Sequence, residues 1–233
     1  MARQGTGSRI ILRILGVIVA AFMLFCALYS MNIIKTEDKV EVAGFKDDFG
    51  NVFTGFLVSG IKEGYGDIVY EDGNRYTGEF AGGEYNGQGT FKAAAGWEYR
   101  GEFKGGLPDG QGIFRDGAGG VFSGAFEAGK ITGEGAFSKL EGWIYDGMWN
   151  QGRQTGEGTF TYADGSVYKG GFKDGAASGF GIYRDAAGWR YEGGFSQGLF
   201  HGKGTLVFPD GEIMTVEWEA GIPIYPEEED ESQ

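Results

Sequence analysis

The chain has 233 residues and a formal net charge of −13, and its 47 glycines would by number alone be typical of a disordered protein. All 33 acidic residues follow position 36, whereas four of the 20 basic residues precede it, so the part after position 36 carries a net charge of −17. This charge predicts repulsion from nucleic acid, and no nucleic-acid partner is expected. The single cysteine, Cys26, excludes an intrachain disulfide.

The first predicted element is a transmembrane α-helix at residues 14–34, which follows a short basic tail at residues 1–13. The helix has 21 residues without a charge, and at about 1.5 Å per residue it spans roughly the 30 Å hydrocarbon core of a bilayer. A cleaved secretory signal is the alternative, but its apolar region is about 7 to 15 residues long. Phe25 and Leu28 also stand where a cleavage site needs small residues. We therefore predict an uncleaved signal anchor that crosses the membrane once.

The orientation of this helix is predicted from the basic residues on its two sides. Three arginines precede the span and three lysines follow it: Arg3, Arg9 and Arg13, then Lys35, Lys39 and Lys46. The counts are equal, but the arginines lie on a very short tail beside the amino terminus, which favours leaving that tail in the cytoplasm. The expected localisation is a single-pass membrane protein whose carboxyl-terminal part lies on the non-cytoplasmic side.

A predicted stalk at residues 35–47 leads to a repeat array at residues 48–224, in which one pattern recurs every 23 residues. Each complete unit opens on an aromatic residue, with glycine two positions later and a large aromatic residue four positions later, where only the first unit has Leu57 instead. Complete units start at Phe53, Tyr76, Tyr99, Phe122, Tyr145, Tyr168 and Tyr191, and a partial unit starts at Met214. A fixed period of this length indicates a stack of supersecondary units.

The array is followed by an acidic tail at residues 225–233. Five consecutive acidic residues occupy positions 227–231, after Pro223 and Pro226. Such a run is typical of a solvated, disordered end.

Each unit is predicted to be a β-hairpin. Alternate residues of a strand share one face, so Tyr76, Gly78 and Phe80 lie together. A turn around Gly83 and Gly87 is expected to lead into a second strand, and Asp-Gly pairs are expected to form the turns between units. Glycine weakens a strand, so we expect it to make room for a ring from the next hairpin. The predicted fold is all-β, an elongated single-layer antiparallel meander of β-hairpins, preceded by the transmembrane helix.

These repeats resemble the membrane occupation and recognition nexus (MORN) repeat. The resemblance is carried in every unit, as in Tyr76-Thr-Gly78-Glu-Phe80-Ala-Gly-Gly83-Glu-Tyr-Asn-Gly87-Gln-Gly89, and it covers Phe53 to Gly211. The resemblance implies an elongated, grooved array of hairpins that serves protein or lipid contacts and dimerisation, without catalysis. The partial last unit departs from the pattern, because Val216 stands where glycine is expected.

The candidate interaction residues are a row of tryptophans in alternate units, each with the tyrosine that opens the following strand: Trp97 and Tyr99, Trp143 and Tyr145, Trp189 and Tyr191. Strand parity places the tryptophans on the aromatic face, at intervals of about 20 Å. Such a row of rings could bind a partner, since aromatic-rich concave surfaces are common recognition sites. The alternative is that the rings only fill the groove at the turns between units.

Catalytic and metal sites are not expected. The only histidine, His201, stands at a variable turn position, and Cys26 lies in the predicted membrane span, so neither a nucleophile-base pair nor a His/Cys metal set can be built. Carboxylates such as Glu98, Glu102 and Asp146 are spread over the polar face. We predict no catalytic residue, no metal site, no cofactor and no enzymatic activity.

The predicted function is a membrane-anchored scaffold or adaptor, whose array binds a protein partner along its aromatic groove or at a sheet edge. Open edge strands favour strand addition, so a homodimer is a further expectation. The alternative is a module that binds glycan or lipid headgroups at the membrane surface.

Overall fold

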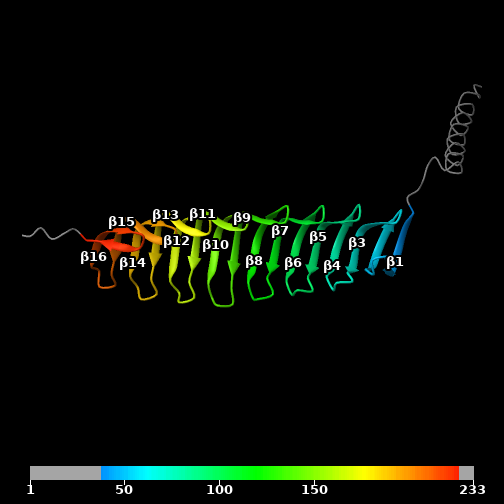
Figure 1. Ribbon diagram of the computed structural model, residues 1–233, viewed down its shortest axis with the longest axis horizontal. Helices are drawn as coiled ribbons and strands as arrows, with labels where there is room; N and C mark the ends of the chain where they lie inside the picture. Colours follow the sequence, from blue (N-terminus) through cyan, green and yellow to red (C-terminus); the bar gives the residue numbers. More distant parts are fainter. Residues whose placement is uncertain (1–37, 226–233) are drawn as a thin grey trace, which may run out of the picture.

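The computed structural model describes residues 38–225, which form one elongated sheet of 17 strands (Figure 1). Each strand pairs antiparallel with the next one along the chain. The strands are β1 (Lys39–Lys46), β2 (Val52–Val58), β3 (Ile61–Val69), β4 (Arg75–Ala81), β5 (Glu84–Lys92), β6 (Glu98–Lys104), β7 (Leu107–Arg115), β8 (Val121–Glu127), β9 (Lys130–Ser138), β10 (Ile144–Asn150), β11 (Arg153–Thr161), β12 (Val167–Lys173), β13 (Ala176–Arg184), β14 (Arg190–Ser196), β15 (Leu199–Val207), β16 (Ile213–Glu219) and β17 (Ile222–Ile224). The prediction of an all-β, single-layer antiparallel meander is confirmed.

Several sequence-based predictions fall on parts of the chain that the structure does not describe. The basic tail at 1–13, the transmembrane helix at 14–34, the start of the stalk and nearly all of the acidic tail lie outside residues 38–225. Within 38–225, no helix is long and apolar enough to cross a bilayer. The membrane anchor therefore stays a prediction.

Two-residue turns close the hairpin of every unit. In β4 and β5, Ala81 pairs with Glu84, and both residues between them, Gly82 and Gly83, have positive φ. Type I′ turns need positive φ at both central positions, and their twist matches that of the flanking strands. In six of the hairpins the first central residue is not glycine yet keeps a positive φ: Ser59, Ala128, Gln151, Asp174, Gln197 and Ala220.

The predicted extent of the hairpin turn was wrong. Gly87 does not belong to the turn, because it lies inside β5, where the pairing register with β4 shifts between Gly78 and Phe80. Gly87 has a φ of +63°, as a bulge of this kind requires. The backbone N–H of Gln88 at the bulge donates to Oε1 of Glu79 at 3.0 Å. The carboxylate of Glu79 thus accepts a hydrogen bond from a backbone N–H that has no partner where the strand pairing is interrupted.

The turns between units follow the prediction for the Asp-Gly pairs. Between β3 and β4, the N–H of Gly73 donates to the carbonyl of Tyr70, and Gly73 has a φ of +85°. Oδ1 of Asp72 accepts the N–H of Asn74 at 2.9 Å. Glycine therefore supplies the left-handed conformation, and aspartate holds the turn from inside.

The opening tyrosine of each unit lies over a pair of glycines. Gly78 of β4 and Gly89 of β5 are cross-strand partners, and a Cβ at Gly89 would clash with Oη of Tyr76. We expected the ring over this gap to come from the next hairpin. It comes from the same strand instead, because Tyr76 precedes Gly78 by two positions and folds along its own strand across both glycines.

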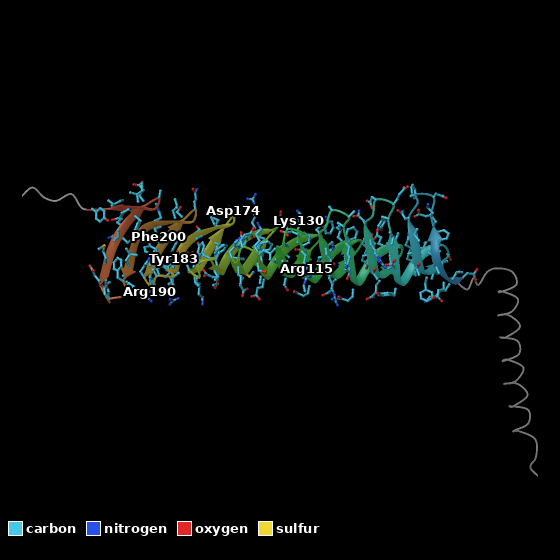
Figure 2. The ribbon with its side chains drawn as sticks, turned by 90° about the horizontal axis from the view of Figure 1, so that it is seen from below. Arg115, Lys130, Asp174, Tyr183, Arg190 and Phe200 are labelled. Atoms are coloured by element: carbon cyan, nitrogen blue, oxygen red, sulfur yellow. The ribbon has the colours of Figure 1, made fainter. Side chains whose placement is uncertain are left out.

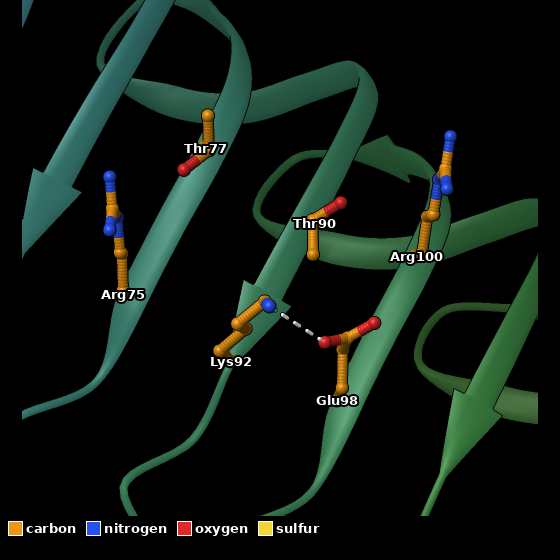
Figure 3. Close-up of a pocket in the computed structure, with 6 residues that line it drawn as sticks. All are labelled: Arg75, Thr77, Thr90, Lys92, Glu98 and Arg100. Atoms are coloured by element: carbon orange, nitrogen blue, oxygen red, sulfur yellow. Dashed lines mark ion pairs between the residues drawn. The ribbon is translucent and has the colours of Figure 1, made fainter.

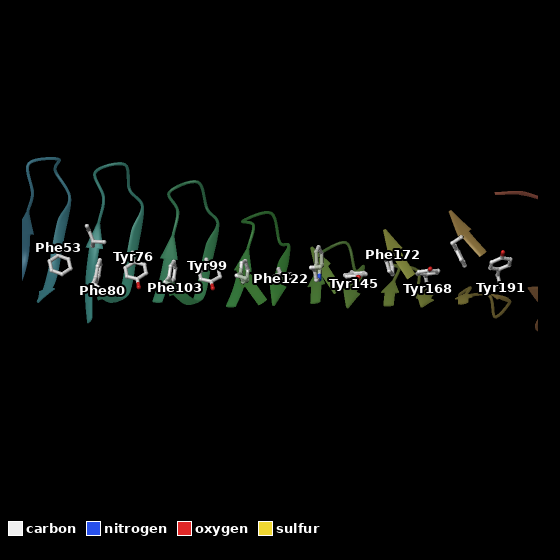
Figure 4. Close-up of a cluster of buried hydrophobic side chains, with 14 residues drawn as sticks. Phe53, Tyr76, Phe80, Tyr99, Phe103, Phe122, Tyr145, Tyr168, Phe172 and Tyr191 are labelled. Atoms are coloured by element: carbon white, nitrogen blue, oxygen red, sulfur yellow. The ribbon is translucent and has the colours of Figure 1, made fainter. Parts of the chain in front are cut away.

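Edge-to-face ring contacts join these tyrosines into one core that runs along the whole array (Figure 4). Tyr76 lies 5.1 Å from Phe80 of its own unit, at 84°, and 5.1 Å from Phe103 of the next unit, at 88°. Each such pair contributes about 0.5 to 1.5 kcal/mol beyond area burial. Every ring therefore links its unit to a neighbour, without a second layer. The core residues are Phe53, Ile68, Tyr76, Phe80, Tyr99, Phe103, Phe122, Phe126, Tyr145, Trp149, Tyr168, Phe172, Tyr191 and Phe195.

The last unit lacks this arrangement. Met214 replaces the opening aromatic residue and is half-exposed, while Val216 replaces the glycine and is only 6% exposed. The indole N–H of Trp149 in the middle of the array donates to the carbonyl of Gly135 at 2.8 Å, whereas the buried Nε1 of Trp218 has no partner. Packing at the carboxyl-terminal end is thus less complete than in the middle.

Exchange of tyrosine and phenylalanine at the first position of a unit should change the free energy of unfolding in opposite directions at the two sites. The hydroxyl of Tyr145 donates to the carbonyl of Met148 at 3.0 Å, and the unit of Phe122 has the same bulge but no hydroxyl. We expect Tyr145→Phe to lower the free energy of unfolding by about 1 kcal/mol and Phe122→Tyr to raise it by about as much. Urea unfolding measures both values. Two changes of the same sign would contradict this account of the hydroxyl.

Alkaline pH should destabilise the array. Burial raises the pKa of Tyr99, Tyr145 and Tyr168 to about 12, and the carboxylates of Glu102 and Asp146 add to this beside Tyr99 and Tyr145. The unfolded tyrosines ionise near pH 10 while the folded ones stay neutral, so this stability is fully present below about pH 10 and is lost as pH rises through about 12. Urea unfolding at about pH 8 and about pH 11 should show the decrease. Equal values would show that ionisation of these tyrosines is not coupled to folding.

Candidate interaction surfaces

Each of the three tryptophans packs between aromatic rings of two neighbouring units and remains partly exposed. Trp97 stacks on Phe91 with ring centres 5.0 Å apart, and Trp143 stacks on Phe160 at 5.4 Å. Trp189 lies tilted against Tyr183 at 5.2 Å. Trp97 is 37% exposed, and the other two are half-buried. The rings are thus held in place by the sheet while part of each remains accessible.

Trp143 and Trp189 belong to a continuous run of rings, which we call the aromatic stripe. Tyr162 connects them, since it lies 4.6 Å from Phe160 and 5.9 Å from Tyr183. Tyr162 is 40% exposed, and the candidate residues predicted from the sequence did not include it. The stripe consists of Phe137, Trp143, Phe160, Tyr162, Tyr183 and Trp189.

The sequence does contain a signal for Tyr162. The turns between units that lack tryptophan also start 46 residues apart, at positions 70, 116, 162 and 208. Three of these first positions carry an aromatic ring, namely Tyr70, Tyr162 and Phe208. The turn at 116–120 carries Asp116 and Gly120 instead. The row of rings is therefore interrupted there, and Trp97 is separated from the stripe.

Polar side chains replace tryptophan in the alternate units. Oδ1 of Asn74 accepts the N–H of Ala94 in the next turn at 2.9 Å, and Oγ of the fully buried Ser166 accepts the N–H of Ala186 at 3.1 Å. Consecutive turns are thus fixed either by a hydrogen bond or by an indole. This accounts for the two-unit period of the sequence.

The three tyrosines proposed as contact residues lie elsewhere. Tyr99, Tyr145 and Tyr191 are at most 1% exposed, and each ring covers a glycine pair. Their hydroxyls donate to backbone carbonyls three residues later. They hold the hairpins together and present no surface to a partner, so the candidate surface is reduced to the tryptophans.

The opposite face of the sheet has a shallow groove of about 370 Å³ over β4, β5 and β6 (Figure 3). Two ion pairs lie there: Nε of Arg75 with Oδ1 of Asp67 at 2.7 Å, and Nζ of Lys92 with Oε2 of Glu98 at 3.1 Å. The groove is lined by Arg75, Thr77, Thr90, Lys92, Glu98 and Arg100. Basic side chains are therefore concentrated on one part of an acidic protein.

The carboxylates considered for catalysis have structural partners. Glu98 pairs with Lys92, and Oε1 of Glu102 accepts the N–H of Gln111 at 3.0 Å. His201 is exposed within β15, so its predicted place in a turn was wrong. Among residues 38–225, no group of three or more His, Cys, Asp or Glu side chains could hold a metal ion.

The two edges of the sheet differ in their capacity to add a strand. β17 is three residues long, and its pairing with β16 starts directly after a two-residue turn. In this register the backbone nitrogen of Pro223 faces away from β16, towards the free edge of the sheet. Proline has no N–H, which leaves this edge without that donor. β1 is eight residues long and no strand within residues 38–225 pairs with its outer edge, although a register shift between Val42 and Phe45 bends it. Strand addition is therefore favoured only at β1.

Comparison with solved structures finds similar folds at low sequence identity. One is the TCP domain of SAS-4 (dCPAP) of Drosophila melanogaster in complex with a proline-rich motif of Ana2 (dSTIL), with 12% identity, 76% of this chain and 88% of that chain covered, and a TM-score of 0.43. Another is the wild-type TCP10 domain of Danio rerio CPAP in complex with a peptide of Danio rerio STIL, with 11% identity, 78% and 100% covered, and a TM-score of 0.33. The comparison with curated proteins found no match.

The MORN repeat model matches six segments of the chain: residues 53–75, 76–97, 99–121, 145–167, 168–190 and 191–213. These segments start at or beside the units predicted from the sequence and cover more than half of the chain. Residues 122–144 have the same fold without a match. On this evidence the chain belongs to the MORN repeat family.

Proposed function

We propose that the chain is a membrane-anchored scaffold whose repeat array binds a protein partner along the aromatic stripe. The observation that carries this proposal is the accessible side of the stripe, where Tyr162 is 40% exposed between two half-buried tryptophans. Large aromatic rings that are fixed before binding lose little conformational entropy, and they often dominate the energy of protein interfaces. The uncharged residues 14–34 support the anchor.

The scaffold would keep its geometry because the sheet cannot bend freely between units. The edge-to-face contacts of the core join each unit to the next, as between Tyr145 and Phe172 at 4.8 Å. Stability in such an array is approximately a sum of units and nearest-neighbour contacts. A partner along the stripe would therefore meet rings at fixed spacing over β9 to β14.

The predicted homodimer is retained only for one end of the array. Pro223 makes the edge of β17 a poor template, so strand addition between two copies would use β1. A glycan or lipid-headgroup ligand is the alternative occupant of the stripe, and the experiment below distinguishes it from a protein.

Photocrosslinking in intact cells should locate the partner on the aromatic stripe. Benzoylphenylalanine replaces Tyr162 in one variant of the full chain and Phe180 in the matched control. Phe180 is also aromatic and is 65% exposed, but its strand position places it on the opposite face. We expect a discrete protein adduct from position 162 and at least about a tenfold weaker one from position 180.

Other outcomes of this experiment contradict the proposal. Adducts of equal intensity from both positions would indicate unspecific contacts, and the absence of adducts at position 162 would exclude a partner on the stripe. An adduct at position 162 that contains lipid or glycan would assign the surface to the alternative function.

Labelling of single cysteines should define the membrane orientation. In a Cys26→Ala background, Ser8→Cys and Lys130→Cys are each treated in intact cells with a membrane-impermeant maleimide. Lys130 is exposed at the start of β9, directly after a hairpin turn. We expect labelling at position 130 only, because the short basic tail should remain in the cytoplasm. Labelling at position 8 only would reverse the orientation, and labelling at both positions would contradict a single membrane pass.

A further inference from the structure

The groove over β4 to β6 belongs to a basic surface that extends to β7. We call it the basic groove, and its charged residues are Asp67, Arg75, Lys92, Glu98, Arg100 and Arg115. Four of these are basic and two are acidic, whereas the protein after position 36 has a net charge of −17. We propose that the basic groove binds the acidic segment 227–231 of a second copy of this chain, so that copies associate head to tail.

Two of the four basic side chains are available for an anion. Within residues 38–225, neither Arg100 nor Arg115 forms an ion pair. Both are exposed, and Arg115 is the cross-strand partner of Glu98, which places it on the same face as Lys92. Guanidinium groups bind carboxylates through two parallel hydrogen bonds, so each arginine can hold one acidic side chain.

The length of the groove matches that of the acidic segment. Arg75, Lys92, Glu98 and Arg115 are successive cross-strand neighbours from β4 to β7. Three strand spacings of about 4.8 Å give roughly 14 Å, and five extended residues span about 16 Å. Residues 227–231 are all acidic, and side chains of an extended segment alternate between two faces, so such a segment laid across these strands would turn three carboxylates towards the groove.

The acidic segment cannot reach the groove of its own chain. Tyr225 directly follows β17, and ten strand spacings of about 4.8 Å, roughly 48 Å, separate β17 from β7 along the array. The six residue-to-residue steps from Tyr225 to Glu231 reach about 22 Å at most. The segment must therefore come from another copy.

Association of this kind has a defined symmetry. The two contacting surfaces lie on different parts of the chain, so the contact is heterologous and leaves a free groove at one end and a free acidic segment at the other. The contact uses the face opposite the aromatic stripe and does not depend on the proposed function. Because it joins exposed charges, it should weaken as salt increases.

Two complementary variants of the full chain test this proposal in detergent. The groove variant carries Arg100→Gln and Arg115→Gln, and the tail variant carries E227Q, E228Q, E229Q, D230N and E231Q. Sedimentation velocity at about 50 mM salt should show association of the unmodified chain, at least about fivefold weaker at about 300 mM. Each variant alone should lose the salt-dependent association, whereas an equimolar mixture should recover it as a one-to-one complex, because the mixture holds one intact groove for one intact acidic segment.

Two controls separate this contact from a general effect of charge and identify its location. Lys130→Gln with Lys173→Gln removes the same charge, and Lys130 lies at the opposite edge of the ribbon from Arg115 (Figure 2). This control should associate like the unmodified chain. Carbodiimide should join Lys92 to the acidic segment in the mixture, and mass spectrometry identifies the linked peptides.

The proposal is overturned if the groove variant and the control associate equally, or if the mixture associates no more strongly than either variant alone. It is also overturned if the tail variant associates by itself as strongly as the unmodified chain, since a different acidic segment would then occupy the groove.

Discussion

The contact between a tyrosine ring and a pair of glycines is the constraint on which this structure depends. A sheet of one layer has no second layer to cover its apolar face, so its rings must be buried against its own backbone. Tyr76 can lie against β4 and β5 only because Gly78 and Gly89 have no side chains there. The loss of strand propensity at both glycines is offset by burial of a whole ring. Hairpins built in this way can be added along one axis without limit.

A single-layer array leaves both faces of the sheet accessible, and in this protein the two faces have different chemistry. One face carries the aromatic stripe around Tyr162, whose rings contact rings of the neighbouring units and remain partly exposed. The opposite face carries the basic groove near Arg100, on a chain that is otherwise acidic. Alternation of side chains along each strand separates these surfaces, so a partner on one face need not compete with a partner on the other.

The turns between units set how far the aromatic surface extends. Where Trp143 or Trp189 ends a turn, its indole packs against the second strand of the unit before the turn and of the unit after it. Where Ser166 takes this place, its hydroxyl accepts a hydrogen bond from the N–H of Ala186 and fixes the next turn. Both solutions hold consecutive turns in register, but only the indole gives the surface a large ring. Gly120 provides neither, so the surface is interrupted near the middle of the array.

The sequence by itself determined the 23-residue unit, the antiparallel meander and the face on which Tyr76 and Phe80 lie, because period and strand parity are properties of the chain alone. Tertiary structure decided which ring covers Gly78, since that depends on how a side chain folds along its strand. It decided that Gly87 forms a bulge, because the register is a property of two paired strands. It also buried Tyr99 and exposed Tyr162, since exposure depends on neighbouring units that local pattern cannot place.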